Sequence, residues 1–446
     1  MALTVKQKLG FGVFDLGGNL LFTALGFWSL NYLTDTVGLA AALAGVAVMI
    51  GKFWDAVTDP VMGYVSDRTN SRWGRRRPYL LFGAIPLFLT MVFFFTKPDY
   101  LASGGVTNPI VLMIWAVVAL MALNTASTVI NIPYSSLTPE LTNDYHERTS
   151  LNGYRFGCAV FGTIIGAAAV QPIVAAFPDR KSGFIAVGVV LGGIIAVTTL
   201  LTFFGVKERA HTKEDFPTKG FFLTYKEVLT NKPYLILLFT YALHLCALTF
   251  LQGILVYYTK YIYNNEGLAT PAMVALLLVA MVFIPISVLV AKKIGKKLVY
   301  QICFIILGST CLLVFFLGHT LGPNFFLVIM LYAGIGLGFS YVAPFAMVPD
   351  AVEYDAIKTG ERKEGAYYGI WTFIAKVGQS LSVFLSGIIL SAGGYIADAV
   401  QSDGAIFAIR LIIGPIPALV FAVAIIVVHF YPLDEKMYNK LVKSES

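Results

Sequence analysis

Charged side chains are scarce in this chain. They make up 13% of its 446 residues, whereas hydrophobic residues make up 57% and the mean hydropathy is +0.76. So little polar surface cannot cover a water-soluble globular protein of this length, and the composition excludes that class. Long apolar runs recur instead, and a run of about 20 residues is enough to cross a bilayer as a helix.

Cysteine and histidine are rare as well. All four cysteines fall in apolar runs, and the five histidines are scattered without ligand spacing. Neither a disulfide framework nor the spacing of a metal site is visible in these patterns, which favour thiols that act as small apolar side chains. HExxH, GxSxG and related motifs are absent, so the sequence predicts neither an enzyme nor a cofactor. No cleavable signal peptide is expected, because the first apolar run is too long and lacks a small-residue cleavage site.

Twelve apolar segments are predicted to span the membrane as helices. Their approximate ranges are 11–34, 39–66, 78–96, 108–138, 150–175, 182–205, 233–259, 268–291, 298–319, 324–347, 366–392 and 405–431. Of the 32 lysines and arginines, 24 lie in connections on the side of the N-terminus and four on the opposite side. Cytoplasmic loops carry such an excess, so both termini are predicted to be cytoplasmic. The net charge of +7 therefore indicates topology and not nucleic-acid binding.

The longest predicted cytoplasmic connection divides the spans into two groups of six. We expect an N-terminal six-helix bundle, a cytoplasmic loop, a C-terminal six-helix bundle and a cytoplasmic tail over 1–205, 206–232, 233–431 and 432–446. An internal repeat supports this division, because Pro60 and Pro285 each precede a basic turn by the same distance. The second copy has Ile284 where the first has Asp59, so the acidic chemistry is expected in the N-terminal bundle. Duplicated halves are typical of transporters that bind cargo between the repeats.

Two carboxylates lie inside the second predicted span. Lys52, Asp55 and Asp59 are spaced to share one face of a helix, with Thr58 beside them. One interpretation is an ion pair that only joins helices, but a static pair leaves the second carboxylate costly at membrane depth. The other, which we favour, is a site for a small cation or a shared proton, since either relieves the repulsion between Asp55 and Asp59.

Other polar residues in the spans allow two interpretations each. Lys376 lies in the middle of a span and is a functional candidate. Arg155 either snorkels to the surface or serves the site, and Asp15 is a second-rank candidate. Gly162 and Gly166 have the spacing that lets two helix backbones approach closely.

The uncharged polar and aromatic side chains in the spans also allow two interpretations each. Asn19, Asn131 and Thr128 can hydrogen-bond cargo hydroxyls or join neighbouring helices. Tyr341 and Trp371 can stack on the C–H face of a sugar or fill the core.

Two sequence blocks resemble a known family. WDAVTDPVMGYVSDRTNSRWGRRRP over 54–78 resembles the hallmark of the melibiose permease-like glycoside-pentoside-hexuronide:cation symporters, a branch of the major facilitator superfamily. DAVEYDAIKTGERKEG over 350–365 resembles the family's loop between spans ten and eleven. Matching features run from Lys8 to the twelfth span. The resemblance implies an all-α membrane protein with the major facilitator fold, whose twelve transmembrane helices form two pseudo-symmetric six-helix bundles.

The resemblance also implies roles for individual residues. The cation site would consist of Asp55, Asp59, Thr58 and Thr128, with the two carboxylates as metal ligands if the cation is Na⁺. Positions that match cargo-contacting or coupling residues are Asn19, Asn131, Arg155, Tyr341, Trp371 and Lys376, and we add Lys52 from the polar stripe. A cytoplasmic gate would be formed by Asp67, Arg68, Arg75, Arg76 and Arg77.

This chain departs from the melibiose-type pattern, which has aspartates at the positions of Asn19 and Asn131 and a tryptophan at that of Ser135. The lost negative charge is expected to leave Arg155 and Lys376 less neutralised, so we lean toward an anionic or oligosaccharide-like glycoside.

The sequence thus predicts a symporter of the cell membrane, functional as a monomer, that imports a glycoside, pentoside or hexuronide with Na⁺ or H⁺ by alternating access. A lysophospholipid carrier of the same fold and a non-transporting membrane sensor are the alternatives. Neither the sugar nor the coupling ion can be read from the sequence.

Overall fold

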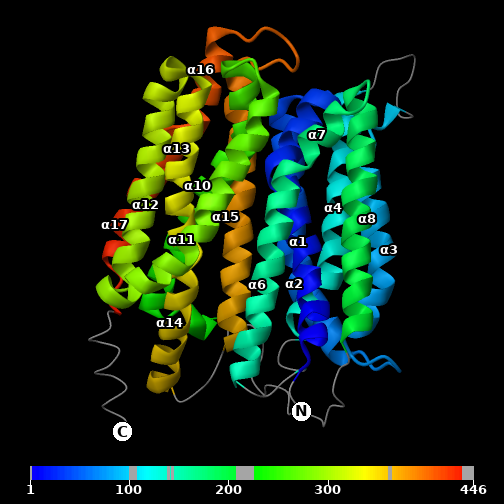
Figure 1. The fold of residues 1–446 in the computed structure, drawn as a ribbon, viewed down its shortest axis with the longest axis vertical. Coiled ribbons are helices and arrows are strands. Elements are labelled where there is room, and N and C mark those ends of the chain that lie inside the picture. The colour runs from blue at the N-terminus through cyan, green and yellow to red at the C-terminus, as the bar shows by residue number, and fades with distance from the viewer. Residues whose placement is uncertain are drawn as a thin grey trace. The chain divides into compact units, whose positions relative to one another are not determined.

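The computed structural model describes residues 3–99, 108–137, 141, 145–206, 226–359 and 364–433, and Figure 1 shows their fold. All regular structure in these residues is helical, as predicted. Eleven of the described helical stretches are long and apolar enough to cross a membrane. The longest, Lys296–Thr359, contains both the ninth and the tenth predicted spans. Each of the other ten overlaps one predicted span, so every predicted span contains described helix.

Packing divides the chain into two units. Unit 1 comprises Met1–Glu214 and Val383–Ala405, and unit 2 comprises Asp215–Ser382 and Ile406–Ser446. Most of the predicted loop 206–232 and of the predicted tail 432–446 lies outside the described residues.

Unit 1 is a bundle of long helices. α1 packs on α6 and α8, α2 packs on α4, and α3 packs on both α4 and α8. The bounds are α1 Val5–Asn31, η1 Tyr32–Thr36, α2 Ala41–Arg68, α3 Arg77–Phe94, α4 Pro109–Ser135, α6 Tyr145–Ala168, α7 Val170–Ala175 and α8 Arg180–Gly205.

Short polar side chains determine where several of these helices begin. Thr4 and Gln7 form a capping box before α1, in which each side chain accepts the other residue's backbone N–H. Asn108 and Asp179 cap α4 and α8, where each side chain accepts a backbone N–H of the first turn. The capping box explains why α1 begins at Val5, six residues before the predicted span.

Glycines bring α6 against α1. A Cβ added to Gly162 would lie 2.0 Å from the backbone oxygen of Leu16, and one added to Gly166 would lie 2.4 Å from that of Leu20. Only a hydrogen atom fits such contacts, so the two backbones touch along two turns, as the glycine spacing predicts. The same packing sets Arg155 of α6 beside the beginning of α1.

A late segment of the chain completes unit 1. The helix α15 (Glu364–Ala392) enters this unit at Val383. A Cβ added to Gly387 would lie 2.3 Å from the backbone oxygen of Ala41 on α2. Further along, the hydroxyl of Tyr395 donates to Asp35 Oδ1 at 2.5 Å. Residues from the last quarter of the sequence therefore pack against η1 and the start of α2.

Unit 2 is a second helical bundle. α11 packs on α13, and α17 packs on both α10 and α12 around a buried aromatic cluster that includes Tyr300, Phe304 and Phe421. The bounds of its further helices are α10 Lys232–Ile262, η3 Glu266–Leu268, α11 Ala269–Ile294, α12 Lys296–Leu313, η4 Val314–Gly318, α13 His319–Ser340, α14 Ala343–Thr359, α16 Asp403–Ile413 and α17 Pro415–His429.

Candidate functional site

Two carboxylates of α2 meet one hydroxyl of α4 inside unit 1. Thr128 Oγ1 lies 2.7 Å from Asp55 Oδ1 and 3.1 Å from Asp59 Oδ1. The helix α2 continues through Pro60, so the two carboxylates stay about one turn apart on the same helix. A threonine hydroxyl carries a single proton, so it can donate to only one carboxylate at a time. Carboxylate and hydroxyl oxygens together are ligands that suit a hard cation.

The other residues of the predicted polar stripe contact different partners. Thr58 Oγ1 donates to the backbone oxygen of Asp55 at 3.1 Å, within its own helix. Lys52 Nζ lies 5.7 Å from the ring centroid of Phe22 on α1, which is a cation–π distance. Thr58 thus contacts a backbone oxygen, whereas Thr128 contacts both carboxylates.

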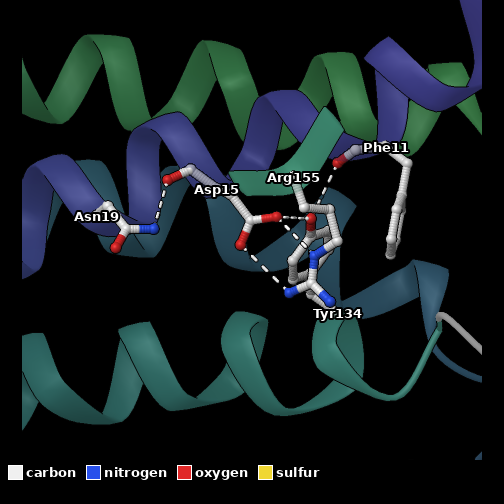
Figure 2. Close-up of polar contacts among 5 residues, drawn as sticks. All are labelled: Phe11, Asp15, Asn19, Tyr134 and Arg155. Atoms are coloured by element: carbon white, nitrogen blue, oxygen red, sulfur yellow. Dashed lines mark hydrogen bonds and ion pairs between the residues drawn. The ribbon is translucent and has the colours of Figure 1, made fainter. Parts of the chain in front are cut away.

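Arg155 of α6 is paired with Asp15 of α1, as Figure 2 shows. Arg155 Nε lies 2.7 Å from Asp15 Oδ2, and Nη2 lies 3.2 Å from Oδ1, so both carboxylate oxygens are engaged. The hydroxyl of Tyr134 contacts the same Oδ2 and lies 3.1 Å from the backbone oxygen of Phe11. The guanidinium carbon is 4.9 Å from the ring centroid of Tyr134. Both charged side chains are largely buried, with 23% of Arg155 and 15% of Asp15 exposed.

This pairing corrects one expectation from the sequence. Arg155 is not left less neutralised by the change from aspartate to asparagine, because Asp15 supplies a carboxylate to it. Asp15 was only a second-rank candidate, since 140 residues separate it from Arg155 and nothing in the sequence pairs the two. The sequence clue to the role of Asp15 is its charge within a predicted span, one helical turn before Asn19.

The amides of Asn19 and Asn131 each donate one N–H group within their own helix. Asn19 Nδ2 donates to the backbone oxygen of Asp15 at 2.8 Å, and Asn131 Nδ2 donates to Ser127 Oγ at 2.8 Å. Asn131 Oδ1 lies 3.6 Å from the place of a Cβ on Gly18, so α4 presents it beside this turn of α1. Ser127 was missed from the sequence, although its i, i+4 spacing to Asn131 could have indicated it.

The remaining predicted cargo contacts belong to unit 2. Trp371 on α15 is 3% exposed and stacks on Tyr241 of α10, with ring centroids 4.0 Å apart and planes inclined by 12°. This stack covers one face of the indole. Tyr341 follows the end of α13 and is 46% exposed, and Lys376 is half-buried on α15. The roles of these three residues stay predictions.

The predicted gate residues lie where α2 ends and α3 begins. Arg76 donates to a backbone oxygen just after α4, and Arg77 Nη2 donates to one on α8 at 2.8 Å. These contacts attach the start of α3 to two neighbouring helices of unit 1. Arg68 ends α2, Arg75 is half-buried, and the side chain of Asp67 lies outside the described residues. A gating role stays a prediction for all five.

An apolar pocket of about 610 Å³ also lies in unit 1. Phe82 and Pro86 of α3 line it together with Ala126 and Val129 of α4. None of the predicted cation or cargo residues lines this pocket, so the polar cluster is a separate feature.

Residues 10–435 match a protein-family model described as "MFS/sugar transport protein". The Bacillus subtilis protein "uncharacterized symporter YnaJ" is 30% identical over 450 residues, which cover 99% of this chain and 94% of that protein. The isoprimeverose transporter of Lactiplantibacillus pentosus is 29% identical over 439 residues, 96% of this chain and 89% of the relative. A putative sulfoquinovose importer of Escherichia coli K12 is 29% identical over 456 residues, 99% and 94% of the two chains.

Solved structures resemble this one in fold. A bacterial homologue of the human lysosomal transporter Spinster aligns with a TM-score of 0.62 and 13% identity, over 99% of this chain and 96% of that one. The nucleoside transporter NupG aligns with a TM-score of 0.62 and 13% identity, over 96% and 100% of the two chains. At such identities the likeness concerns the fold alone.

Proposed function

The chain belongs to the MFS/sugar transport protein family, and we propose that it couples uptake of a glycoside, pentoside or hexuronide to the entry of Na⁺ or H⁺. It is a multi-pass membrane protein and a symporter of this family, not an enzyme. The predicted family and the all-α major facilitator fold are therefore confirmed. The proposal adds the coupling ion, the sugar cargo, alternating access of the two bundles, cytoplasmic termini in the cell membrane and a functional monomer.

One observation carries the coupling proposal: Thr128 Oγ1 lies within 3.1 Å of carboxylate oxygens from both Asp55 and Asp59. Two carboxylates this close repel each other in a medium of low dielectric. A cation among these oxygens offsets both charges and takes the hydroxyl oxygen as a further ligand. A proton shared by the pair relieves the same repulsion, so the arrangement supports coupling to either ion.

Coupling to the cargo follows from the register of α4. Asn131 is three residues after Thr128, so the two side chains share one face of this helix. A cation that fixes Thr128 also fixes the helix turn that presents Asn131. Since linkage is reciprocal, cargo bound at Asn131 then raises the affinity for the cation by the same factor. The relatives named for isoprimeverose and sulfoquinovose support a sugar as the cargo.

The test is transport by the purified protein in proteoliposomes, with a panel of radiolabelled glycosides and an imposed Na⁺ or proton gradient. We expect gradient-driven accumulation of at least one glycoside. Asp59→Asn should abolish that accumulation, because one carboxylate alone holds the cation weakly. The matched control is Asp179→Asn, the same substitution at an exposed helix cap outside the site. Unaltered accumulation by Asp59→Asn would show that the coupling site lies elsewhere.

The same vesicles separate the two alternatives. A lysophospholipid carrier would move a labelled lysophospholipid and no glycoside. A membrane sensor would bind a glycoside without catalysing counterflow, the exchange of labelled for unlabelled cargo.

A further inference from the structure

The positive charge of Arg155 is neutralised inside unit 1 by the carboxylate of Asp15. The Asp15 carboxylate engages it through two oxygens, at 2.7 and 3.2 Å. Tyr134 contacts the same carboxylate and stacks near the guanidinium, as Figure 2 shows. The pair is largely buried. An anionic cargo group that displaced Asp15 from Arg155 would leave a buried carboxylate without its cation, a loss on the order of 100-fold in affinity.

The side-chain amides of Asn19 and Asn131 provide hydrogen-bond acceptors in the same unit. The amide nitrogens of Asn19 and Asn131 donate to Asp15 O and Ser127 Oγ. In Figure 2 the side-chain oxygen of Asn19 is turned away from the carbonyl that its nitrogen contacts. Within the described part of the chain, neither side-chain oxygen makes a hydrogen bond. A carbonyl oxygen accepts hydrogen bonds and donates none, so these two oxygens suit sugar hydroxyls, whereas a carboxylate or sulfonate oxygen has no proton to offer them.

The charges of the site residues in unit 1 point the same way. Three carboxylates, Asp15, Asp55 and Asp59, stand against two cationic side chains, Lys52 and Arg155. Their sum is one negative charge, which one bound Na⁺ or proton cancels. With a cation bound, these five side chains of unit 1 therefore carry no net positive charge that would attract an anionic cargo.

We infer that Asp15 is a specificity-determining residue, which holds Arg155 and so restricts the cargo to uncharged, polyhydroxylated glycosides. This inference rests on the proposed sugar symport and gives its cargo a charge class. It reverses the leaning toward an anionic cargo drawn from the sequence, because that leaning treated Arg155 as poorly neutralised. Asp15 acts through Arg155, so it positions a charge and need not touch the cargo.

The experiment compares counterflow of two cargos of matched shape, a methyl glucoside and the corresponding methyl glucuronide, in proteoliposomes. The wild-type protein should exchange the neutral glycoside at least roughly tenfold faster, a comparison that requires no variant. Asp15→Asn releases Arg155, so the rate ratio should move toward the glucuronide by roughly tenfold or more. Asp15→Glu keeps the negative charge and should keep the preference for the neutral glycoside.

The double variant Asp15→Asn/Arg155→Gln separates charge selectivity from a structural effect. If released Arg155 attracts the glucuronide, removing both charges should cancel the gain, whereas a general loss of structure would lower both rates alike. A wild-type preference for the glucuronide would overturn the inference and leave sugar transport intact. Failure to exchange any glycoside of the wider panel would overturn the proposed function, together with the inference that rests on it.

Discussion

The contact between α1 and α6 offers a sharp test of the packing, through the substitution Gly162→Ala. The added methyl group would lie 2.0 Å from the backbone oxygen of Leu16. An ordinary contact requires 3.4 Å or more, so the helices must separate by about 1.4 Å or distort locally. The obstacle is backbone, which cannot rotate away as the end of a flexible side chain can.

The size of the effect follows from the cost of overpacking, about 1–3 kcal/mol for a methyl-sized insertion. For a unit of about 240 residues, each kcal/mol lowers the melting temperature by about 2–4 °C. We therefore expect Gly162→Ala to lower the melting temperature of unit 1 by several degrees. The separation of α1 from α6 should also stretch the Asp15–Arg155 pair, since each helix carries one partner.

Gly157 on the same helix provides the matched control. A Cβ added there meets nothing within 4 Å, and the residue is exposed. Gly157→Ala should therefore leave stability unchanged or raise it by up to about 1 kcal/mol through helix propensity. The measurement is thermal unfolding of both variants in detergent, followed by tryptophan fluorescence. An unchanged melting temperature for Gly162→Ala, or equal losses for both variants, would refute the packing.

Two further predictions concern hydroxyl and carboxylate contacts. Thr128→Ala should raise the cation concentration for half-maximal counterflow by roughly tenfold, the value of a hydrogen bond to a charged group, whereas Thr58→Ala should change it by less. Equal effects would contradict the assignment of Thr128 as the shared contact. Hydrogen bonds from Ser182 lower the pKa of the Asp179 carboxyl. The ionised carboxylate therefore stabilises the start of α8 fully at pH values above its ordinary pKa of about 3.9. This stabilisation is lost as the pH falls through the lowered pKa. The melting temperature of wild type minus that of Asp179→Ala should accordingly be positive at about pH 6 and shrink below about pH 4; a difference that grows on acidification would contradict the cap.

The spans could be predicted because hydropathy and length suffice to specify a membrane helix. The exact ends of the helices and the interruptions within them could not be predicted from hydropathy, because they depend on local side-chain and backbone chemistry. The capping box at Thr4 extends the first helix beyond its apolar run. The π-helical turn Val314–Gly318 and the positive φ of 81° at Gly322 interrupt an otherwise continuous helical stretch and have no hydropathy signature.

The candidate site was only partly predictable. Helical spacing alone set Asp55 and Asp59 on one face, because both lie on a single helix. The contact with Thr128 requires α4 to pack on α2, which only the resemblance implied. Predicting the Asp15–Arg155 pair requires knowing that α6 packs on α1. The sequence shows the closely spaced glycines on α6 but not which helix they contact. That choice depends on packing over the whole unit.

Because the segment Val383–Ala405 belongs to unit 1, this unit can be completed only late in translation. Tyr395 is synthesised 360 residues after Asp35, the carboxylate to which its hydroxyl donates. At about 5–20 residues per second, the ribosome takes roughly 20–70 seconds to cover that stretch. Throughout this interval the first helices sit in the bilayer without the Tyr395 hydroxyl and without the close contact between Gly387 and Ala41. A nascent chain that stalls just before Val383 therefore contains the six membrane-length helical stretches that begin unit 1 but lacks the segment Val383–Ala405 that completes this unit.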